Sequence, residues 1–331
     1  MITAQYVVTE ECNLKCSYCY VNQNKVSMTK ETFDSSFEKF KQSIGESPYK
    51  FDFFGGEPLK NWGLVKYVVG ILNADKFCKT KTLVTNGLLL DKNKVDFLED
   101  NKVRVIISFD GLWSDKRGYD LIPNYLKNKD LFKRLGNSFN TMIHPDNLNL
   151  VDNYDFVISR FDMIPNFKLI RDDVWKEDHI SKFKEEFRRL CHRCEYYLTV
   201  EGKNYLPDII KNSIYRLKMG LVDGVIPSNC GAGTEIHCYS PSGEKYPCER
   251  YATNGKKSVE SSKFEECLKC DISSVCEKGC LFLNEQKGIN KNLCEIYKII
   301  FEEVIDLNHR MKNNKSWKKI VTNLDGVIYD K

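Results

Sequence analysis

Residues 11–22 read ECNLKCSYCYVN and contain three cysteines, Cys12, Cys16 and Cys19, spaced C-x3-C-x2-C. Three thiols can hold a metal, but a structural zinc site or a complete iron–sulfur cluster takes four ligands. The residues just before them, ITAQYVV (2–8), predict a strand from their β-branched and aromatic side chains. A zinc site completed by a distant ligand is one interpretation. A cluster with one open position at the end of a strand is favoured, because strand ends carry active sites in α/β domains.

Strand-like and helical segments alternate along the first part of the chain. The predicted strands are 2–8, 49–54, 81–87, 103–111, 138–143 and 166–172, and the predicted helices between them are 29–44, 64–72, 94–100, 124–135 and 147–160. This alternation predicts βαβ units and a parallel sheet. Six units fall short of the eight of a closed barrel. We therefore expect an α/β fold, a partial (β/α)6 barrel of the TIM type.

Composition excludes several classes of protein. The 331 residues include 50 basic and 46 acidic side chains, a net charge of +4, which gives no argument for a nucleic-acid partner. No apolar run is long enough to cross a bilayer, and the N-terminus lacks the basic start of a signal peptide. We expect a cytoplasmic protein. Fourteen cysteines in such a chain indicate metal ligands rather than disulfides.

Eight further cysteines lie in the last third of the chain, where regular hydrophobic periods are lost. They are Cys230, Cys238, Cys248, Cys267, Cys270, Cys276, Cys280 and Cys294. The run 267–280 reads C-x2-C-x5-C-x3-C, and four residues separate Gly243 from Cys248 in G-x4-C. Eight thiolates make two sets of four, the ligand set of a 4Fe–4S cluster, with two zinc sites as the alternative. A small region of this composition needs metal to hold it together.

The sequence predicts three parts. Residues 1–190 form the partial barrel, 191–225 a helical linker that contains the incidental thiols Cys191 and Cys194, and 226–331 a cysteine-rich domain. The last part should end in a helix at about 290–312 and a hairpin around Asp325 and Gly326.

The stretch CNLKCSYCY after an N-terminal strand resembles the radical S-adenosylmethionine (SAM) superfamily. The resemblance implies that Cys12, Cys16 and Cys19 bind three irons of a 4Fe–4S cluster and that SAM chelates the fourth. It also implies cleavage of SAM to a 5′-deoxyadenosyl radical, which abstracts a hydrogen from the substrate.

Further segments at predicted strand ends are similar to family motifs: FFGGEP (53–58), TNG (85–87) and SFDG (108–111). WSDKRG (113–118) stands where family members often have a His-Asp-x-x-Arg stretch, and it lacks the His. The resemblance implies that SAM is bound by Tyr18, Gly55, Gly56, Glu57, Pro58, Asn86, Ser108 and Arg117. Asp110 is expected to contact the ribose or the substrate, with a turn role beside Gly111 as the alternative.

The order of the later cysteines resembles the SPASM extension of radical SAM enzymes. That resemblance implies two auxiliary 4Fe–4S clusters, three clusters in all. The first would be held by Cys230, Cys238, Cys248 and Cys280, and the second by Cys267, Cys270, Cys276 and Cys294. With every iron ligated, the auxiliary clusters are expected to transfer electrons.

The resemblance implies an oxidoreductase that modifies a peptide or protein, as in the maturation of ribosomally made peptides. Glu249, directly after Cys248, is the expected base, where sulfatase-maturing relatives usually have Asp. A sulfatase-type maturase and a small-molecule dehydrogenase are the alternatives, and a metal-stapled binding protein is the non-enzyme hypothesis. Expected partners are a peptide or protein substrate and an electron donor such as flavodoxin or ferredoxin. Leader recognition is expected to be absent, built into the barrel, or supplied by a separate protein.

Overall fold

The computed structural model describes residues 1–331 except 173, 224–229, 259–264 and 328–331. The chain forms two compact units, each assembled from segments that are distant in sequence. Unit 1 comprises Met1–Phe109, Ser114–Ser138 and Gly231–Glu260. Unit 2 comprises Asp110–Trp113, Phe139–Cys230 and Ser261–Lys331.

Unit 1 contains a sheet whose strands follow one another in the order β4-β3-β2-β1-β7-β8. The strands are β1 (Ile2–Thr9), β2 (Tyr49–Gly55), β3 (Cys78–Thr85), β4 (Val103–Ser108), β7 (Ile236–Tyr239) and β8 (Lys245–Tyr246). The pairs from β4 to β7 are all parallel, and β8 is antiparallel to β7. The predicted α/β fold with a parallel sheet is therefore confirmed.

Strand β7 comes from the cysteine-rich part of the chain and was not predicted. Its four residues, IHCY, pair in parallel with β1, so that Cys238 lies opposite Gln5. Because β1 leads directly into the three-cysteine loop, this pairing makes Cys238 part of the same compact unit as that loop.

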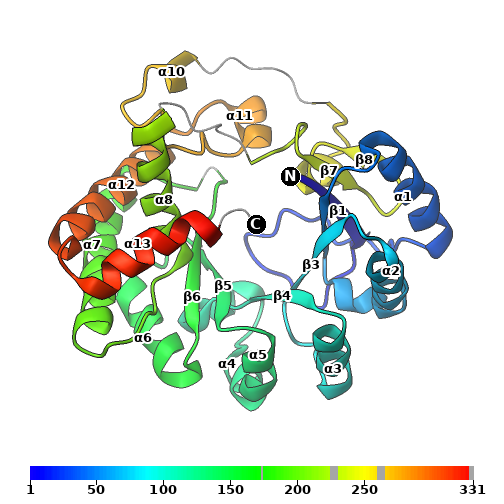
Figure 1. Ribbon diagram of the computed structural model, residues 1–331, viewed down its shortest axis with the longest axis horizontal. Coiled ribbons are helices and arrows are strands. Elements are labelled where there is room, and N and C mark those ends of the chain that lie inside the picture. The colour runs from blue at the N-terminus through cyan, green and yellow to red at the C-terminus, as the bar shows by residue number, and fades with distance from the viewer. Residues whose placement is uncertain (173, 224–229, 259–264, 328–331) are drawn as a thin grey trace. The chain divides into compact units, whose positions relative to one another are not determined.

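The helices of unit 1 cover the outside of this sheet (Figure 1). They are α1 (Lys30–Ile44), η1 (Pro58–Asn61), α2 (Trp62–Ala74), α3 (Lys92–Asp100), α4 (Ile122–Lys127), α5 (Lys129–Leu135) and α9 (Glu249–Thr253). The predicted cap of the first helix is confirmed, since Thr29 accepts a hydrogen bond from the Thr32 N–H (3.1 Å). The α1 face that carries Phe33, Phe37, Phe40 and Ile44 is buried, and its Phe33 ring packs on Tyr6 and Phe51.

Unit 2 contains two neighbouring strands and a layer of long helices. The elements are β5 (Ser138–Ile143), whose first residue belongs to unit 1, α6 (Leu150–Phe161), β6 (Ile164–Leu169), α7 (Glu177–Thr199), α8 (Asp208–Asp223), α10 (Glu265–Leu268), α11 (Leu281–Lys287), α12 (Lys291–Met311) and α13 (Lys315–Val327). The 3-10 helix η2 (Gly111–Arg117) has residues in both units. Helices α7 and α12 pack side by side (Figure 1). Strand β6 begins and ends earlier than the predicted 166–172.

Cys191 and Cys194 lie on the buried face of α7, inside the hydrophobic core of unit 2. Burial raises the pKa of the Cys194 thiol to about 12, and the thiol lies 3.5 Å from the Tyr154 hydroxyl. A raised pKa disfavours the thiolate that metal binding requires, so both residues act as core side chains.

The predicted C-terminal hairpin was wrong. Residues Lys315–Val327 form helix α13, with Trp317 and Leu324 buried in the core of unit 2. Trp317, Ile320, Val321 and Leu324 follow the i, i+3, i+4, i+7 pattern of an apolar helix face, which outweighs the local turn preference of Asp-Gly.

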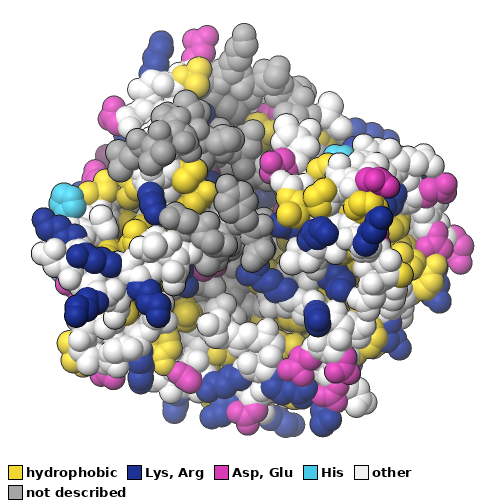
Figure 2. Space-filling view, in the orientation of Figure 1, with side chains coloured by type: hydrophobic (Ala, Val, Ile, Leu, Met, Phe, Trp, Pro, Cys, Tyr) yellow, Lys and Arg dark blue, Asp and Glu magenta, His cyan; other side chains and the backbone are white. Residues whose placement is uncertain are grey.

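Basic and acidic side chains both occur across the face shown in Figure 2, as the small net charge of +4 leads one to expect. Among the described residues, no helix combines the length and apolar content needed to cross a bilayer.

Candidate active site

Backbone hydrogen bonds connect the end of β2 to the end of β1 and to the start of the three-cysteine loop, residues 11–22. The Gly56 N–H donates to the Thr9 carbonyl (2.9 Å), and the Glu57 N–H donates to the Glu11 carbonyl (2.8 Å). A Cβ on Gly55 would lie 2.1 Å from the Thr9 oxygen, and one on Gly56 would lie 2.4 Å from the Glu11 oxygen. The glycines were interpreted as allowing a ligand to approach. In the structure they allow two segments of backbone to cross.

Glu57 is fully buried and joins the ends of two strands. Its carboxylate accepts hydrogen bonds from the Thr85 hydroxyl (2.7 Å), the Asn86 N–H (2.7 Å) and the Leu59 N–H (3.0 Å). The last of these bonds caps η1, whose first residue is Pro58. Burial raises the pKa of the Glu57 carboxyl, and these hydrogen bonds offset only part of that shift. Glu57 thus has a structural role, because its hydrogen bonds position the backbone of GGEP.

Hydrogen-bond donors surround the cysteine sulfurs of the loop. Cys12 Sγ accepts from the Leu14 N–H (3.4 Å) and from the side-chain amide of Asn86 (3.9 Å). Gln23 donates to Cys19 Sγ at 3.8 Å. Thiolates that ligate iron–sulfur clusters are stabilised by such donors. Burial also raises the pKa of the Cys12 thiol, so metal binding would have to displace its proton. Among the described residues no three metal-ligating side chains are gathered as a site for a metal ion, so the assignment of these cysteines to a cluster stays a prediction that the donors support.

Asn86 also holds the loop directly, because its amide donates to the Asn13 side chain at 2.7 Å. Its backbone carbonyl and that of Ser108 both accept hydrogen bonds from the Tyr125 hydroxyl. The structure therefore places Asn86 and Ser108, two predicted SAM contacts, around one buried tyrosine at the ends of β3 and β4.

Arg117 lies beside the loop, as the sequence predicted. It is only 5% exposed, and its guanidinium lies 5.7 Å from the centre of the Tyr18 ring. The neighbouring Lys116 carbonyl accepts a hydrogen bond from the Ser17 N–H (2.8 Å). A buried cation next to the loop is compatible with a role in binding the carboxylate of SAM, which stays a prediction.

Asp110 is buried in unit 2, where its carboxylate accepts a hydrogen bond from the Met142 N–H of β5 (2.9 Å). Its carbonyl accepts from Asn153 (3.1 Å), and the same side chain approaches Gly111 so closely that a Cβ there would lie 2.1 Å from the Asn153 oxygen. The carboxylate therefore connects a turn to a strand, in agreement with the structural alternative.

Glu249 begins helix α9, one residue after Cys248, and lies in the same unit as the three-cysteine loop. Its carboxylate accepts a hydrogen bond from the Tyr20 hydroxyl at the end of that loop (3.1 Å), and its backbone N–H donates to Gln5 of β1 (3.1 Å). Burial, and then the charge of Glu249, raises the pKa of Tyr20 well above its usual value, so Tyr20 remains the donor. Glu249 is therefore half-buried between the loop and a predicted cluster ligand.

The sequence did not identify a row of polar residues across the sheet of unit 1. Gln5, Asp52, Thr82 and Arg104 occupy matching positions on β1, β2, β3 and β4. Burial raises the pKa of the Asp52 carboxyl, and the charge of Glu249 adds to this shift. The sequence signal that could have identified Asp52 is a carboxylate between phenylalanines in the strand YKFDFF.

The four cysteines assigned to the second auxiliary cluster line one cavity of about 140 Å³ in unit 2, which we call the thiol cavity. They are Cys267, Cys270, Cys276 and Cys294. Burial, followed by the charges of the other three thiols, raises the pKa of Cys294 to about 11. The Lys278 N–H donates to Cys276 Sγ (3.3 Å). Four thiols around one cavity fit the ligand set of a 4Fe–4S cluster.

The cysteines assigned to the first auxiliary cluster are divided between the units. Cys238 and Cys248 are buried in unit 1, whereas Cys230 and Cys280 belong to unit 2. This ligand set therefore remains a prediction.

The chain is similar to known proteins in sequence. Residues 6–147, which include the three-cysteine loop and GGEP, match the family described as the radical SAM superfamily. The chain is 27% identical to the radical SAM cyclopropyl synthase TigE of Paramaledivibacter caminithermalis, over 91% of this chain and 73% of TigE. It is 24% identical to the cysteine-type anaerobic sulfatase-maturating enzyme of Clostridium perfringens (strain ATCC 13124), over 92% of this chain and 96% of that enzyme.

Two solved structures share the fold. Native anSMEcpe with bound AdoMet and the Cp18Cys peptide superposes with a TM-score of 0.69 at 20% identity, covering 95% of this chain and all of that one (100%). Streptococcus suis SuiB bound to the precursor peptide SuiA superposes with a TM-score of 0.58 at 16% identity, covering 86% of this chain and 73% of SuiB.

The chain contains a radical SAM domain and is a radical SAM enzyme of the SPASM, sulfatase-maturase-like kind. Its cofactors are SAM and a 4Fe–4S cluster.

Proposed function

We propose that this enzyme oxidatively modifies a residue of a peptide or protein substrate. The observation that carries the proposal is the contact between Tyr20 and Glu249, which holds a carboxylate beside the three-cysteine loop. The relatives support it: one is a sulfatase-maturating enzyme, and the structures of anSMEcpe and SuiB that share this fold contain peptides.

Cys12, Cys16 and Cys19 would hold the cluster that SAM completes, and the predicted SAM contacts would lie along the ends of β2, β3 and β4. When bound, these cofactors supply a 5′-deoxyadenosyl radical that removes a hydrogen atom from the substrate. Two further 4Fe–4S clusters in the cysteine-rich part would accept the remaining electron. An external donor such as flavodoxin or ferredoxin would supply electrons to the first cluster.

Glu249 would take the proton that leaves the substrate in the same oxidation. The Tyr20 hydroxyl and the anchored backbone of α9 fix its orientation. In balance, the substrate loses one hydrogen atom, one proton and one electron, a two-electron oxidation that forms a new bond or a double bond. A positioned general base contributes roughly a factor of 10²–10⁴ to such a step.

The test uses the reconstituted enzyme with SAM, a reductant and peptides encoded next to its gene, with products analysed by mass spectrometry. We expect a peptide that has lost two hydrogens. The Glu249→Gln variant should cleave SAM normally but form product at least about tenfold more slowly. Product formation at the wild-type rate by Glu249→Gln would exclude Glu249 as the base. Cleavage of SAM without any modified peptide would contradict the proposed function.

A sulfatase-type maturase is the second candidate, because the similarity to the sulfatase-maturating enzyme extends over nearly the whole of both chains. The same assay with a cysteine-containing sulfatase peptide separates the two. Formylglycine as the product would favour this candidate. A crosslinked or dehydrogenated peptide would favour the first.

A further inference from the structure

Unit 2 contains a second cavity, of about 260 Å³, next to the thiol cavity. Strand β6, helix α8, helix α12 and the cysteine-rich segment all contribute to its walls. The Tyr297 side chain lines both cavities. We call this second cavity the cationic pocket.

Positive charge dominates the lining of the pocket. Lys168, Arg171 and Arg216 are the cations, and Glu277 is the one acid among its lining residues. Arg171 lies 2.5 Å and Arg216 3.2 Å from the Glu277 carboxylate. Two arginines thus share a single carboxylate. Because each guanidinium has five N–H donors, some of these donors remain available to bind a further anion.

The third cation, Lys168, lies 4.0 Å from Asp208, and its charge also helps to lower the pKa of Glu277. Asp208 also faces Lys211 at 3.8 Å, and neither of these two lines the pocket. The lining residues therefore carry an excess of two positive charges, because three cations face one acid.

The size and the apolar walls restrict the ligand further. The pocket is smaller than the roughly 300–1,000 Å³ of cavities that hold whole small molecules. It therefore suits part of a larger ligand. Ile209, Ile300 and Phe301 give it apolar walls next to the cations, which suit the methylene groups of an acidic side chain.

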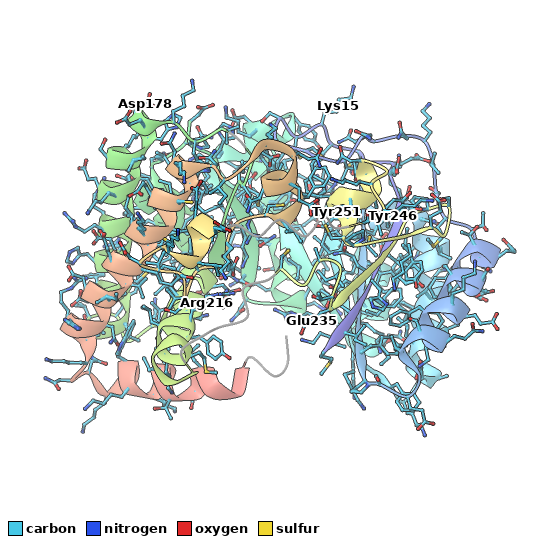
Figure 3. The ribbon with its side chains drawn as sticks, turned by 90° about the horizontal axis from the view of Figure 1, so that it is seen from above. Lys15, Asp178, Arg216, Glu235, Tyr246 and Tyr251 are labelled. Carbon is cyan, nitrogen blue, oxygen red and sulfur yellow. The ribbon has the colours of Figure 1, made fainter. Side chains whose placement is uncertain are left out.

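We propose that the cationic pocket binds an acidic side chain of the peptide substrate, with glutamate as the preferred residue. This inference rests on the proposed function for the identity of the ligand as a peptide. Arg216, which extends from α8 (Figure 3), and Arg171 would bind the carboxylate, and Lys168 would add charge at the rim. The pocket would hold the substrate beside the second set of cysteines.

The test measures binding of two matched peptides to the reconstituted holoenzyme, without reductant, by isothermal titration calorimetry. The probes are acetyl-Gly-Glu-Gly-amide and acetyl-Gly-Gln-Gly-amide, which differ in charge but not in shape. We expect the glutamate peptide to bind at least about fivefold more tightly, because charged hydrogen bonds are stronger than neutral ones.

Two lysines that share Asp208 provide matched variants. Lys168→Gln should remove at least about half of the preference for glutamate, whereas Lys211→Gln, outside the pocket, should retain it. Arg216→Gln should abolish the preference. Equal affinity for the two peptides, or an equal loss in Lys168→Gln and Lys211→Gln, would overturn the proposal.

The binding assay is independent of turnover. If the enzyme modifies peptides but does not distinguish the two probes, the pocket assignment fails and the proposed function stands. If the pocket selects the glutamate probe but no peptide is modified, the binding site stands and the peptide-modifying function fails.

Discussion

The three-cysteine loop of unit 1 and the cysteine-rich segment of unit 2, residues 265–294, are held in place in different ways. The loop is fastened by the backbone of Gly56 and Glu57, by the Asn86 amide and by Lys116. In the segment, Val275 is the only buried residue from Glu265 to Cys280, and Leu268 is 67% exposed.

The hydrogen bonds of the segment are mostly local. The Cys270 N–H donates to the Cys267 carbonyl, and the Cys276 N–H donates to the Ile272 carbonyl. Its ties to the rest of unit 2 include the ion pairs of Glu277 with Arg171 and Arg216. We therefore predict that the loop keeps its structure without a cofactor, whereas the segment would depend on the proposed auxiliary cluster for a stable structure.

Removal of metal should therefore affect the two regions unequally. The Cys294→Ala variant should lose iron, and its cysteine-rich segment should be cleaved by protease at least about tenfold faster than in the wild type. The sheet of unit 1 should remain resistant. Cys78→Ala is the control, because Cys78 is a half-buried thiol assigned to no cluster. Unchanged iron content and protection in Cys294→Ala would contradict the assignment.

Loss of the Glu57 carboxylate should damage the loop without any change in metal ligands. Glu57→Ala leaves a buried hydroxyl and two buried N–H groups without their acceptor, which should lower the free energy of unfolding by about 3 kcal/mol. Urea denaturation monitored by hydrogen exchange in β2 and β3 measures this change. Glu38→Ala, at an exposed position of α1, should change it by less than about 0.5 kcal/mol. Equal effects of the two variants would refute this role.

Substitution of Gly56, where the backbones of β2 and the three-cysteine loop cross, and of Gly63, which has open space around it, should have opposite effects on stability. Gly56→Ala places a methyl group against the Glu11 carbonyl and should cost about 2 kcal/mol of stability. Gly63→Ala, in helix α2, has no atom within 4 Å of the added carbon and should gain about 0.5–1 kcal/mol. Thermal unfolding of the two variants side by side checks the sign of each change.

Acid should have different, smaller effects on the stability contributed by the carboxylates of Glu57 and Glu277. Burial alone would raise the pKa of Glu277, but Arg171 and Arg216 outweigh it and hold this pKa below its ordinary value of 4.5. The stability that Glu277 contributes is thus present above that value and lost as the pH falls through its lowered pKa. The pKa of Glu57 is raised, so its contribution is complete below 4.5 and is lost as the pH rises through its raised pKa.

Hydrogen exchange measured at a series of pH values below neutrality tests this contrast. Protection of the cysteine-rich segment should decrease toward acid, whereas protection around Glu57 should not. In Glu277→Gln the acid dependence of the segment should disappear. If the segment keeps the same acid dependence in that variant, Glu277 is not its source.

Much of the fold could be predicted because local signals and tertiary structure agree. Thr29 caps α1, and the apolar spacing of Phe33, Phe37 and Phe40 matches the buried face of that helix. The α13 helix was missed because the turn preference of Asp325 and Gly326 received more weight than the apolar spacing before them.

Other features have no local signal. Strand β7 has four residues among glycines and cysteines, and only its pairing with β1 makes it a strand. The burial of Glu57 and its three partners depends on contacts between β2 and β3, which no spacing in the sequence reveals. The contact of Glu249 with Tyr20 joins residues 229 positions apart.

The most direct measurement is the formation of 5′-deoxyadenosine, together with the iron content, in the wild type and in the triple variant Cys12→Ala, Cys16→Ala, Cys19→Ala. The wild type should cleave SAM and contain about twelve irons, the content of three 4Fe–4S clusters. The triple variant should form no 5′-deoxyadenosine and retain about eight irons in the cysteine-rich part. Undiminished cleavage of SAM by the triple variant would contradict the assignment of these cysteines to the reaction centre.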